Sequence, residues 1–357
     1  MTAAVVESSQ ENSQMAQDIG AFTYAVVLLN MGGPDSQNAV RSFLLNLFHD
    51  PDILRLPGGK ITRPLLARFI VSRRLERVKA SYGKIGGGSP LAKIMGEQAK
   101  LLAEKLGSRA RVVCAMRYWH PFTDEAFATL SPEQKIILLP LYPHWCSATS
   151  GSSFREFYKV AAQKGFSQSN IVEVKSYPQS ELFLKAWEAR IAESFDAGLF
   201  DPATTHVVFS AHGVPLSLIR KGDPYEKEIR STFESLVCKL PHGVSSSLAF
   251  QSRVGPVRWL EPDVRAVVDE LGGRKNVKTL IVVPISFTVD NLETLFELNI
   301  ELREQALELG ISDFRCVQAP NTHKLFVDAL ASLANETLQQ IPESQKTNHI
   351  TNYKAMS

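Results

Sequence analysis

Short apolar runs recur along the chain between longer amphipathic segments. They fall into two sets of four, rich in Val, Ile and Leu: 24–30, 111–117, 135–142 and 171–175, then 206–211, 245–251, 278–286 and 313–317. The runs do not alternate cleanly with polar residues, which is typical of strands buried on both faces of a parallel sheet. We therefore predict strands at these positions.

The segments between these runs carry apolar residues at helical spacing, at 97–106, 181–195, 225–236 and 291–309. Strand-like and helix-like segments thus alternate, which indicates an α/β fold with mostly parallel sheets flanked by helices. The two sets also share weak internal similarity, so we predict two Rossmann-like domains facing one cleft. The expected division is an N-terminal domain at 21–165 and a C-terminal domain at 166–335, with disordered tails at 1–20 and 341–357.

Residues with chemically useful side chains gather just after the predicted strands. They occur in the stretches 30–34, 117–118, 142–143, 210–213, 251–253 and 287–288. In open α/β sheets, ligands bind beyond the carboxyl ends of the strands. The pattern therefore predicts a single active-site crevice.

His212 follows one of these strands, within Ser210-Ala211-His212-Gly213. An imidazole can bind a metal ion and can also accept a proton near neutral pH. The alternative is a turn histidine with a purely structural role. The rigid Gly and Pro surroundings and the position at a strand end favour the functional interpretation.

Glu293 follows a second strand, and its position allows two interpretations. Thr288 or Asp290 is suitably placed to cap the next helix, and Glu293 would then lie in the first turn, where the helix dipole favours a carboxylate. The functional alternative is a carboxylate that points into the cleft opposite His212.

Composition narrows the possible functions. The chain has 357 residues, enough for two domains, and its net charge of only +2 argues against a nucleic-acid partner. The four cysteines are scattered and form no C-x-x-C pair, so we expect neither a structural zinc site nor an iron–sulfur cluster. Cys114 and Cys316 lie in apolar runs and are predicted to be buried thiols.

The segment Lys60–Lys79 combines basic and apolar residues, with Glu76 as its only acid. It is either a solvated amphipathic helix, a contact for anionic lipid, or a source of cations for ligand carboxylates. No apolar run approaches the ~20 residues of a spanning helix. The first twenty residues contain no Lys or Arg, so we expect no targeting signal. The expectation is a cytoplasmic protein with a peripheral contact at the inner membrane surface.

Several motifs in order resemble the ferrochelatase family, from about Tyr24 to about Leu333. They are LLNMGGP, a basic RR before YGKIGGGSP, MRYWHP, PLYP followed by TSGSS, SAHGVP with GDPY, FQSRVGP with Trp259, and PISFT with LETL. The resemblance implies the chelatase fold and a lyase that inserts Fe2+ into protoporphyrin IX, or coproporphyrin III, in the last step of haem biosynthesis. Fe2+ would be a substrate, with no tightly bound cofactor.

The resemblance also implies roles for individual residues. His212 and Glu293 match the metal-binding and proton-handling pair. The positions that match the porphyrin pocket or its mouth are Met31, Arg74, Tyr82, Ser89, Arg117, Tyr118, Tyr142 and Trp259.

The chain departs from the family pattern at Asn291, which stands where a histidine is usual and cannot take up a proton in its place. The cysteine-rich C-terminal extension of some members is also absent, and Cys146 alone cannot hold a cluster. Two alternatives remain at this point. One is a chelatase that loads cobalt or nickel into a more reduced tetrapyrrole. The other is a non-catalytic porphyrin or haem carrier, for which Asn291 is the only support.

Overall fold

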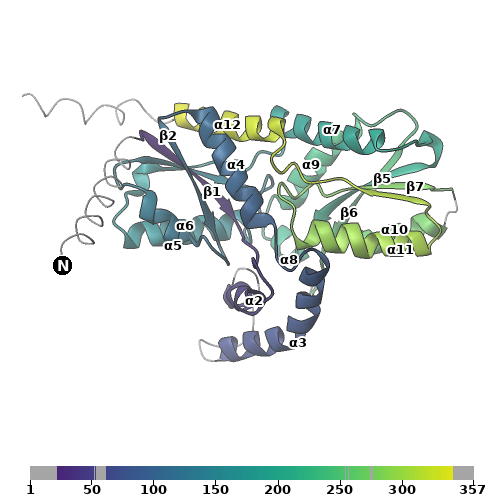
Figure 1. Cartoon of the computed structure of the whole chain (residues 1–357), viewed down its shortest axis with the longest axis horizontal. Coiled ribbons are helices and arrows are strands. Elements are labelled where there is room, and N and C mark those ends of the chain that lie inside the picture. Colours follow the sequence, from purple (N-terminus) through teal and green to yellow (C-terminus); the bar gives the residue numbers. More distant parts are fainter. Residues whose placement is uncertain are drawn as a thin grey trace, which may run out of the picture.

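The computed structural model describes residues 22–51, 53, 62–253, 255, 257–273 and 276–340. The predicted tails and Lys60 lie outside these residues. Two four-stranded parallel sheets stand side by side along the long axis (Figure 1). The first has the order β2-β1-β3-β4 and contains β1 (Tyr24–Asn30), β2 (Ala110–Met116), β3 (Lys135–Pro140) and β4 (Ile171–Glu173). The second has the order β6-β5-β7-β8 and contains β5 (Thr205–His212), β6 (Ser245–Gln251), β7 (Thr279–Val283) and β8 (Asp313–Cys316).

The matching strand orders confirm the repeat and the two Rossmann-like halves. All strand pairings are parallel. Two strands are shorter than their apolar runs because proline has no backbone N–H for the ladder. As a result, β3 ends at Pro140 and β7 ends just before Pro284.

Helices cover both faces of the first sheet. They are α4 (Leu91–Leu106) and α12 (Lys324–Gln339) on one face, and α5 (Thr123–Ala126) and α6 (Ser150–Gln163) on the other (Figure 1). Strand β1 shows why both faces need cover. Val26 and Leu28 belong to the core beneath α4, whereas Val27 and Leu29 belong to the core beneath α6. Successive side chains of a strand point to opposite faces, so a continuous apolar run requires a helix on each side.

The second sheet is covered in the same way. Its helices are α7 (Glu181–Asp196), α8 (Leu216–Ile219), α9 (Tyr225–Val237), α10 (Val264–Gly273) and α11 (Arg303–Glu308), the last of which continues the π-helix η4 (Glu293–Leu302). Short 3-10 turns occur at Phe127–Thr129, Gln168–Asn170 and Pro202–Thr204.

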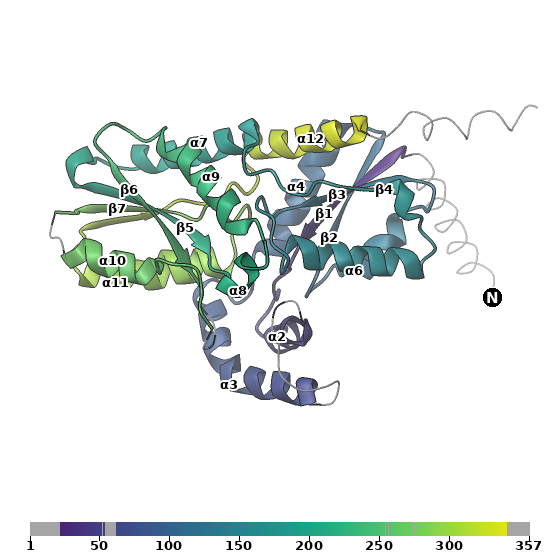
Figure 2. The ribbon, with the colours of Figure 1, turned by 180° about the vertical axis from the view of Figure 1, so that it is seen from behind.

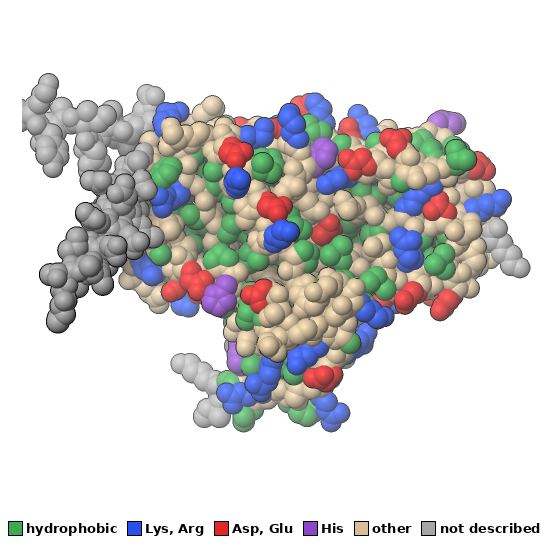
Figure 3. All heavy atoms as spheres, in the orientation of Figure 1, with side chains coloured by type: hydrophobic (Ala, Val, Ile, Leu, Met, Phe, Trp, Pro, Cys, Tyr) green, Lys and Arg blue, Asp and Glu red, His purple; other side chains and the backbone are tan. Residues whose placement is uncertain are grey.

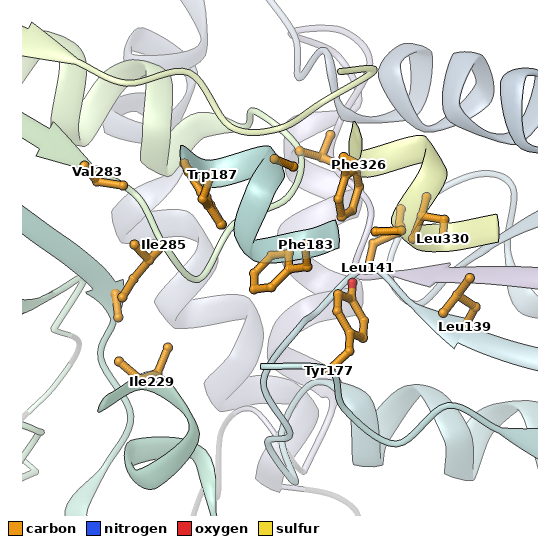
Figure 4. Close-up of a cluster of buried hydrophobic side chains, with 14 of the residues drawn as sticks. Leu139, Leu141, Tyr177, Phe183, Trp187, Ile229, Val283, Ile285, Phe326 and Leu330 are labelled. Atoms are coloured by element: carbon orange, nitrogen blue, oxygen red, sulfur yellow. The ribbon is translucent and has the colours of Figure 1, made fainter. Parts of the chain in front are cut away.

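The two halves share one hydrophobic core (Figure 4). Leu139 comes from the first sheet and Val283 from the second, and Trp187 of α7 is completely buried in the same cluster. Helix α12 closes the core because Phe326 and Leu330 are also fully buried there. Each such side chain contributes about 2 kcal/mol of burial free energy, so the halves form a mutually stabilised body.

An arm made of α2 (Val40–His49) and α3 (Thr62–Lys84) projects below the sheets (Figures 1 and 2). It has its own small core, which includes Phe43, Phe48 and Val71. Basic side chains gather over this arm with apolar ones among them (Figure 3). On α3, Leu65 and Phe69 are 61% and 56% exposed. No helix within the described ranges is long and apolar enough to cross a membrane.

The order of the strands predicts where a ligand binds. β1 pairs with both β2 and β3, and β5 pairs with both β6 and β7. Connections leave these central strands in opposite directions, which opens a crevice at the carboxyl ends of the central pair. The chain enters this region after β1 at Met31, after β5 at His212, and after β7 in the segment that leads to Glu293.

Candidate active site

His212 is the last residue of β5, and its ring is fixed in one tautomer. Its Nδ1 lies 2.7 Å from the carbonyl oxygen of Gly213. A carbonyl only accepts, so Nδ1 carries the proton and Nε2 keeps its lone pair. The backbone is held as well, because the Ser286 hydroxyl accepts from the His212 amide at 2.9 Å and Tyr225 donates to the His212 carbonyl at 2.8 Å. Burial lowers the pKa of His212, although the charge of Glu297 opposes this effect.

Gly213 allows this packing. A Cβ at this position would lie 2.8 Å from the carbonyl oxygen of Gln251, which is closer than side chains tolerate. The Gly213 amide donates to the same oxygen at 2.8 Å. The end of β5 can therefore approach the end of β6 only with glycine after the histidine.

Glu293 begins the π-helix that follows β7. Sequence periodicity predicts one helix over 291–309, whereas the structure has a π-helix at Glu293–Leu302 followed by α11. π-helical segments are rare and are frequently found at functional sites. Burial, together with the neighbouring charge of Glu297, raises the pKa of Glu293 to about 7.

The capping prediction for this helix was wrong in its residues. Asn291, rather than Thr288 or Asp290, uses its side-chain oxygen to accept from the Thr294 amide, at 3.1 Å. Asp290 instead accepts from the Thr294 hydroxyl at 2.8 Å, and Thr288 donates to the carbonyl of Leu141 at 2.7 Å. Asn291 is thus a buried helix cap, which an amide serves as well as any polar side chain.

Glu297 is a site residue that the sequence analysis missed. Its charge acts on His212, Glu293 and Tyr82, so it lies among them. Its carboxylate accepts a 2.5 Å hydrogen bond from Ser252, a non-glycine residue with φ of 66°. The spacing of four residues from Glu293 on one helix was the available signal.

The arm contributes Arg74 and Tyr82 to this neighbourhood. Tyr82 is only 4% exposed, and burial, Glu293 and Glu297 all raise the pKa of its phenol. Burial lowers the pKa of Arg74, Arg77 lowers it further, and the charge of Glu297 opposes both. The Arg74 guanidinium also lies over the Phe48 ring, 5.7 Å from its centroid. α3 therefore brings one cation and one buried phenol beside the acidic helix.

Trp259 stands next to the histidine in space. The segment that carries it is bonded to the chain after His212, because the Leu260 amide donates to the Val214 carbonyl at 3.1 Å. A Cβ on Gly213 would be 3.5 Å from the Trp259 ring. The indole N–H is buried and has no protein partner. Val254 and Pro256 of the same motif lie outside the described residues.

The first half brings Arg117 and Tyr118 together, but both are engaged in the protein. Arg117 forms an ion pair with the buried Asp50 at 2.9 Å, and its Nε donates to Ser152 at 3.1 Å. Tyr118 is 2% exposed and donates to the same Asp50 at 2.7 Å. The Arg117 guanidinium also lies over the Tyr118 ring, 5.3 Å from its centroid, so Tyr118 helps to hold Arg117 in place.

Met31, Ser89 and Tyr142 line the same end of the first sheet and are partly exposed. The Met31 carbonyl accepts from the Tyr118 amide at 2.8 Å. Ser89 packs against Gly33, where an added Cβ would lie only 2.6 Å from the Ser89 oxygen.

All four cysteines are free thiols. Cys114 and Cys316 are partly rather than fully buried and lie on the edge strands β2 and β8, whereas Cys146 is 1% exposed. Burial raises the pKa of each of these three thiols to about 12. Within the described part of the chain, no group of three or more His, Cys, Asp or Glu side chains is arranged to hold a metal ion.

Comparison with known proteins first defines the class of fold. The sirohydrochlorin chelatase SirB from Bacillus subtilis subspecies spizizenii, solved in complex with cobalt, superposes with a TM-score of 0.53 at 12% identity, covering 91% of this chain and 98% of that one. SirB from Bacillus subtilis with Fe3+ gives a TM-score of 0.52 at 13% identity, with 91% and 98% coverage. The two halves therefore form the chelatase fold.

The family follows from sequence. The profile of the ferrochelatase family matches residues 23–338. Ferrochelatase of Synechococcus sp. (strain RCC307) is 44% identical over 88% of this chain and 82% of the relative, and that of Trichormus variabilis is 44% identical over the same shares. The chain belongs to the ferrochelatase family and is a metal chelatase of the lyase class.

Proposed function

We propose that this enzyme inserts Fe2+ into protoporphyrin IX, or into coproporphyrin III, as the last step of haem synthesis. One observation carries the proposal. The Nε2 lone pair of His212 and the carboxylate of Glu293, with a pKa near 7, lie in one neighbourhood at the central strands of the second sheet. Family membership favours this reaction over cobalt or nickel loading.

The reaction exchanges one Fe2+ for two pyrrole N–H protons, so the site must bind a divalent ion and accept protons. His212 and Glu293 bind the arriving Fe2+ through one nitrogen and one oxygen, and such ligands suit this ion without trapping it. As iron passes to the ring, the two groups accept the departing protons. A carboxyl with a pKa near 7 and an imidazole can both do so near neutral pH.

A flat ring shields its central nitrogens and must bend before metal enters. Met31 from the first half and Trp259 from the second provide partly exposed surfaces for contact with the ring. Contacts that fit the bent ring better than the flat one lower the barrier.

The ring propionates are anions and need cationic or hydrogen-bonding partners. Arg74 and Ser89 serve this role, because both are partly exposed and neighbour the site. Arg117 is already paired with Asp50 and acts mainly by fixing the pocket wall, with Tyr142 and Tyr118 beside it. Tyr82 fixes the wall of the pocket that the π-helix forms, close to Glu293 and Glu297.

The reaction needs no resident cofactor and no iron–sulfur cluster. Burial keeps the thiols of Cys114, Cys146 and Cys316 protonated at neutral pH, and a protonated thiol is a poor metal ligand.

The protein works in the cytoplasm, with the arm touching the inner membrane surface. The supporting features are Leu65 and Phe69, both more than half exposed, on the same helix as Arg68, Arg73 and Arg77. Apolar side chains among cations bind anionic lipid interfaces. Such a contact would deliver an apolar porphyrin close to the site.

The test is anaerobic metal insertion followed by absorbance, with Fe2+, Zn2+, Co2+ and Ni2+ supplied separately. We expect turnover with Fe2+, and kcat/KM for protoporphyrin and coproporphyrin then identifies the substrate. Tight porphyrin binding without turnover would instead support a carrier. Turnover confined to Co2+ or Ni2+ with a more reduced tetrapyrrole would overturn the choice of metal.

A further inference from the structure

Asn321 holds Asp290 with both ends of its side-chain amide. The Oδ1 of Asn321 accepts from the Asp290 backbone amide at 2.9 Å, and its Nδ2 donates to the Asp290 carboxylate at 2.6 Å. Asn321 lies between β8 and α12 with φ of 46°, a left-handed conformation that asparagine tolerates better than most residues. Asp290 is only 6% exposed, so its carboxylate depends on these partners.

Asp290 in turn is hydrogen-bonded to the first turn of the π-helix. Its other carboxylate oxygen accepts from the Thr294 hydroxyl at 2.8 Å and from the Ala319 amide at 3.3 Å. Thr294 directly follows Glu293, and its amide is capped by Asn291. Bonds on both sides of Glu293 therefore fix its backbone.

The same asparagine is tied to the first half. Gln98 of α4 is fully buried and donates from Nε2 to the Asn321 carbonyl at 2.7 Å. The Asn321 amide donates to the Thr288 carbonyl at 2.9 Å, and the Thr288 hydroxyl donates to the carbonyl of Leu141 at 2.7 Å. Asn321 is thus bonded to Asp290 before the π-helix and to α4 of the first half, and it is linked through Thr288 to Leu141, which follows β3.

We propose that Asn321 is a positioning residue that fixes the place of Glu293 relative to His212. It does so by holding Asp290, and thereby the first turn of the π-helix, in a fixed position relative to the first half. The inference rests on the proposed function and deepens it. Asn321 touches neither metal nor ring. Its effect is on the geometry of the metal-binding pair, and an error of about 1 Å at such a pair costs roughly 10²-fold in rate.

We call the two hydrogen bonds between Asn321 and Asp290 the clamp. An exchange of these two side chains tests it. In Asp290→Asn the side-chain oxygen at 290 stays with its donors Thr294 and Ala319, and that of Asn321 stays with the 290 backbone amide, so two NH2 groups face each other. In Asn321→Asp two carboxylates face each other. Each single variant therefore breaks the bond between the two side chains. In the double variant the carboxylate at 321 accepts from both the backbone amide and the side-chain NH2 group of residue 290. The side-chain oxygen at 290 still accepts from the Thr294 hydroxyl. The exchange therefore restores every bond, and only the bond between the two side chains has its donor and acceptor reversed.

Two readouts are measured on the full chain, Zn2+ insertion and the binding of Co2+ alone, which is followed by its visible absorption. We expect both single variants to lower kcat at least ~tenfold and to weaken Co2+ binding at least ~tenfold, with the porphyrin Kd within about twofold of the parent. The exchange should return both values to within about threefold. Asn321→Gly keeps the backbone bonds and the positive φ, and should behave like the single variants.

Asn170→Asp is the matched control, because this asparagine bridges Lys135 and Pro132 away from the site and should change neither readout. Folded single variants that keep parental Co2+ affinity would overturn the clamp. An exchange that fails to restore it would also overturn the clamp, by assigning the effect to the Asp290 charge itself. A parent that inserts no metal would refute the proposed function, while the Co2+ series would still decide the clamp.

Discussion

The two halves share one strand order but differ in the electrostatics at the ends of their sheets. At the end of the first sheet, the buried charge of Asp50 is met by Arg117, Tyr118 and Ser152, so that network is electrostatically satisfied. At the end of the second sheet, Glu293 and Glu297 repel each other beside a histidine whose pKa burial lowers. The first network keeps its side chains in fixed positions, whereas the two carboxylates of the second favour the binding of a cation. We therefore propose that the first half mainly supports the ring, whereas the second half handles the metal and the protons.

The largest effect is expected at the second half. His212→Ala removes the Nε2 lone pair, so kcat for metal insertion should fall about 10³-fold, while the porphyrin Kd changes little because the ring is held mainly by the first half. Stopped-flow absorbance and fluorescence quenching measure the two quantities. A variant that keeps its rate would remove the functional distinction between the halves.

The second prediction contrasts two carboxylates by stability. Asp50→Asn should lower the free energy of unfolding by about 2 kcal/mol, because a 4% exposed carboxylate loses its ion pair and hydroxyl donors. Glu293→Gln should instead raise it by about 1 kcal/mol at pH 8. The raised pKa means that the folded state disfavours the ionised form above pH 7 relative to the unfolded state. Urea unfolding of both variants checks the signs, and equal losses would refute the contrast.

The third prediction concerns the arm that the first half carries. Replacing Leu65 and Phe69 together by Ser should weaken binding to phosphatidylglycerol vesicles about tenfold, since two exposed apolar side chains are lost. Turnover of detergent-dispersed porphyrin should be unchanged. Exchanging exposed Leu307 for Ser provides the control on the opposite half. Equal vesicle binding by all three proteins would contradict a lipid contact through α3.

The smallest expected effect is a shift in the pH dependence of kcat/KM. Glu293 must be ionised to bind metal and accept a proton, so kcat/KM should fall as the pH drops through about 7. Glu297→Gln removes a neighbouring negative charge that raises the pKa of Glu293, and the acid limb should therefore move to lower pH. Glu301→Gln, one turn further along the helix, is the comparison variant and should leave the limb nearer its original place. A limb that moves to higher pH with Glu297→Gln would have the wrong sign.

Much of the scaffold was predictable because buried parallel strands leave a clear apolar pattern. β1 has the predicted bounds, and α7 and α9 end within a residue or so of the predicted ends. Periodicity could not reveal the π-helix, since apolar residues at three- and four-residue spacing fit either type of turn. Nor could it show that α12 seals a core shared by both halves, because that depends on where distant segments meet.

The site was predictable in part for a similar reason. Strand ends and motifs predicted His212 and Glu293 as site residues, but the burial of each side chain depends on packing that local sequence does not encode. The hydrogen bond from the buried Tyr118 to Asp50, for example, could not be predicted. Glu297 was missed although its spacing from Glu293 was visible, since an acidic residue on a helix is usually solvated.

X-ray absorption of Zn2+ bound to the porphyrin-free protein tests most directly whether the second half binds the metal. We expect one imidazole nitrogen and carboxylate oxygen bound directly to Zn2+, with the imidazole signal lost in His212→Ala and unchanged in Arg117→Ala. An imidazole signal that persists in His212→Ala would contradict the account.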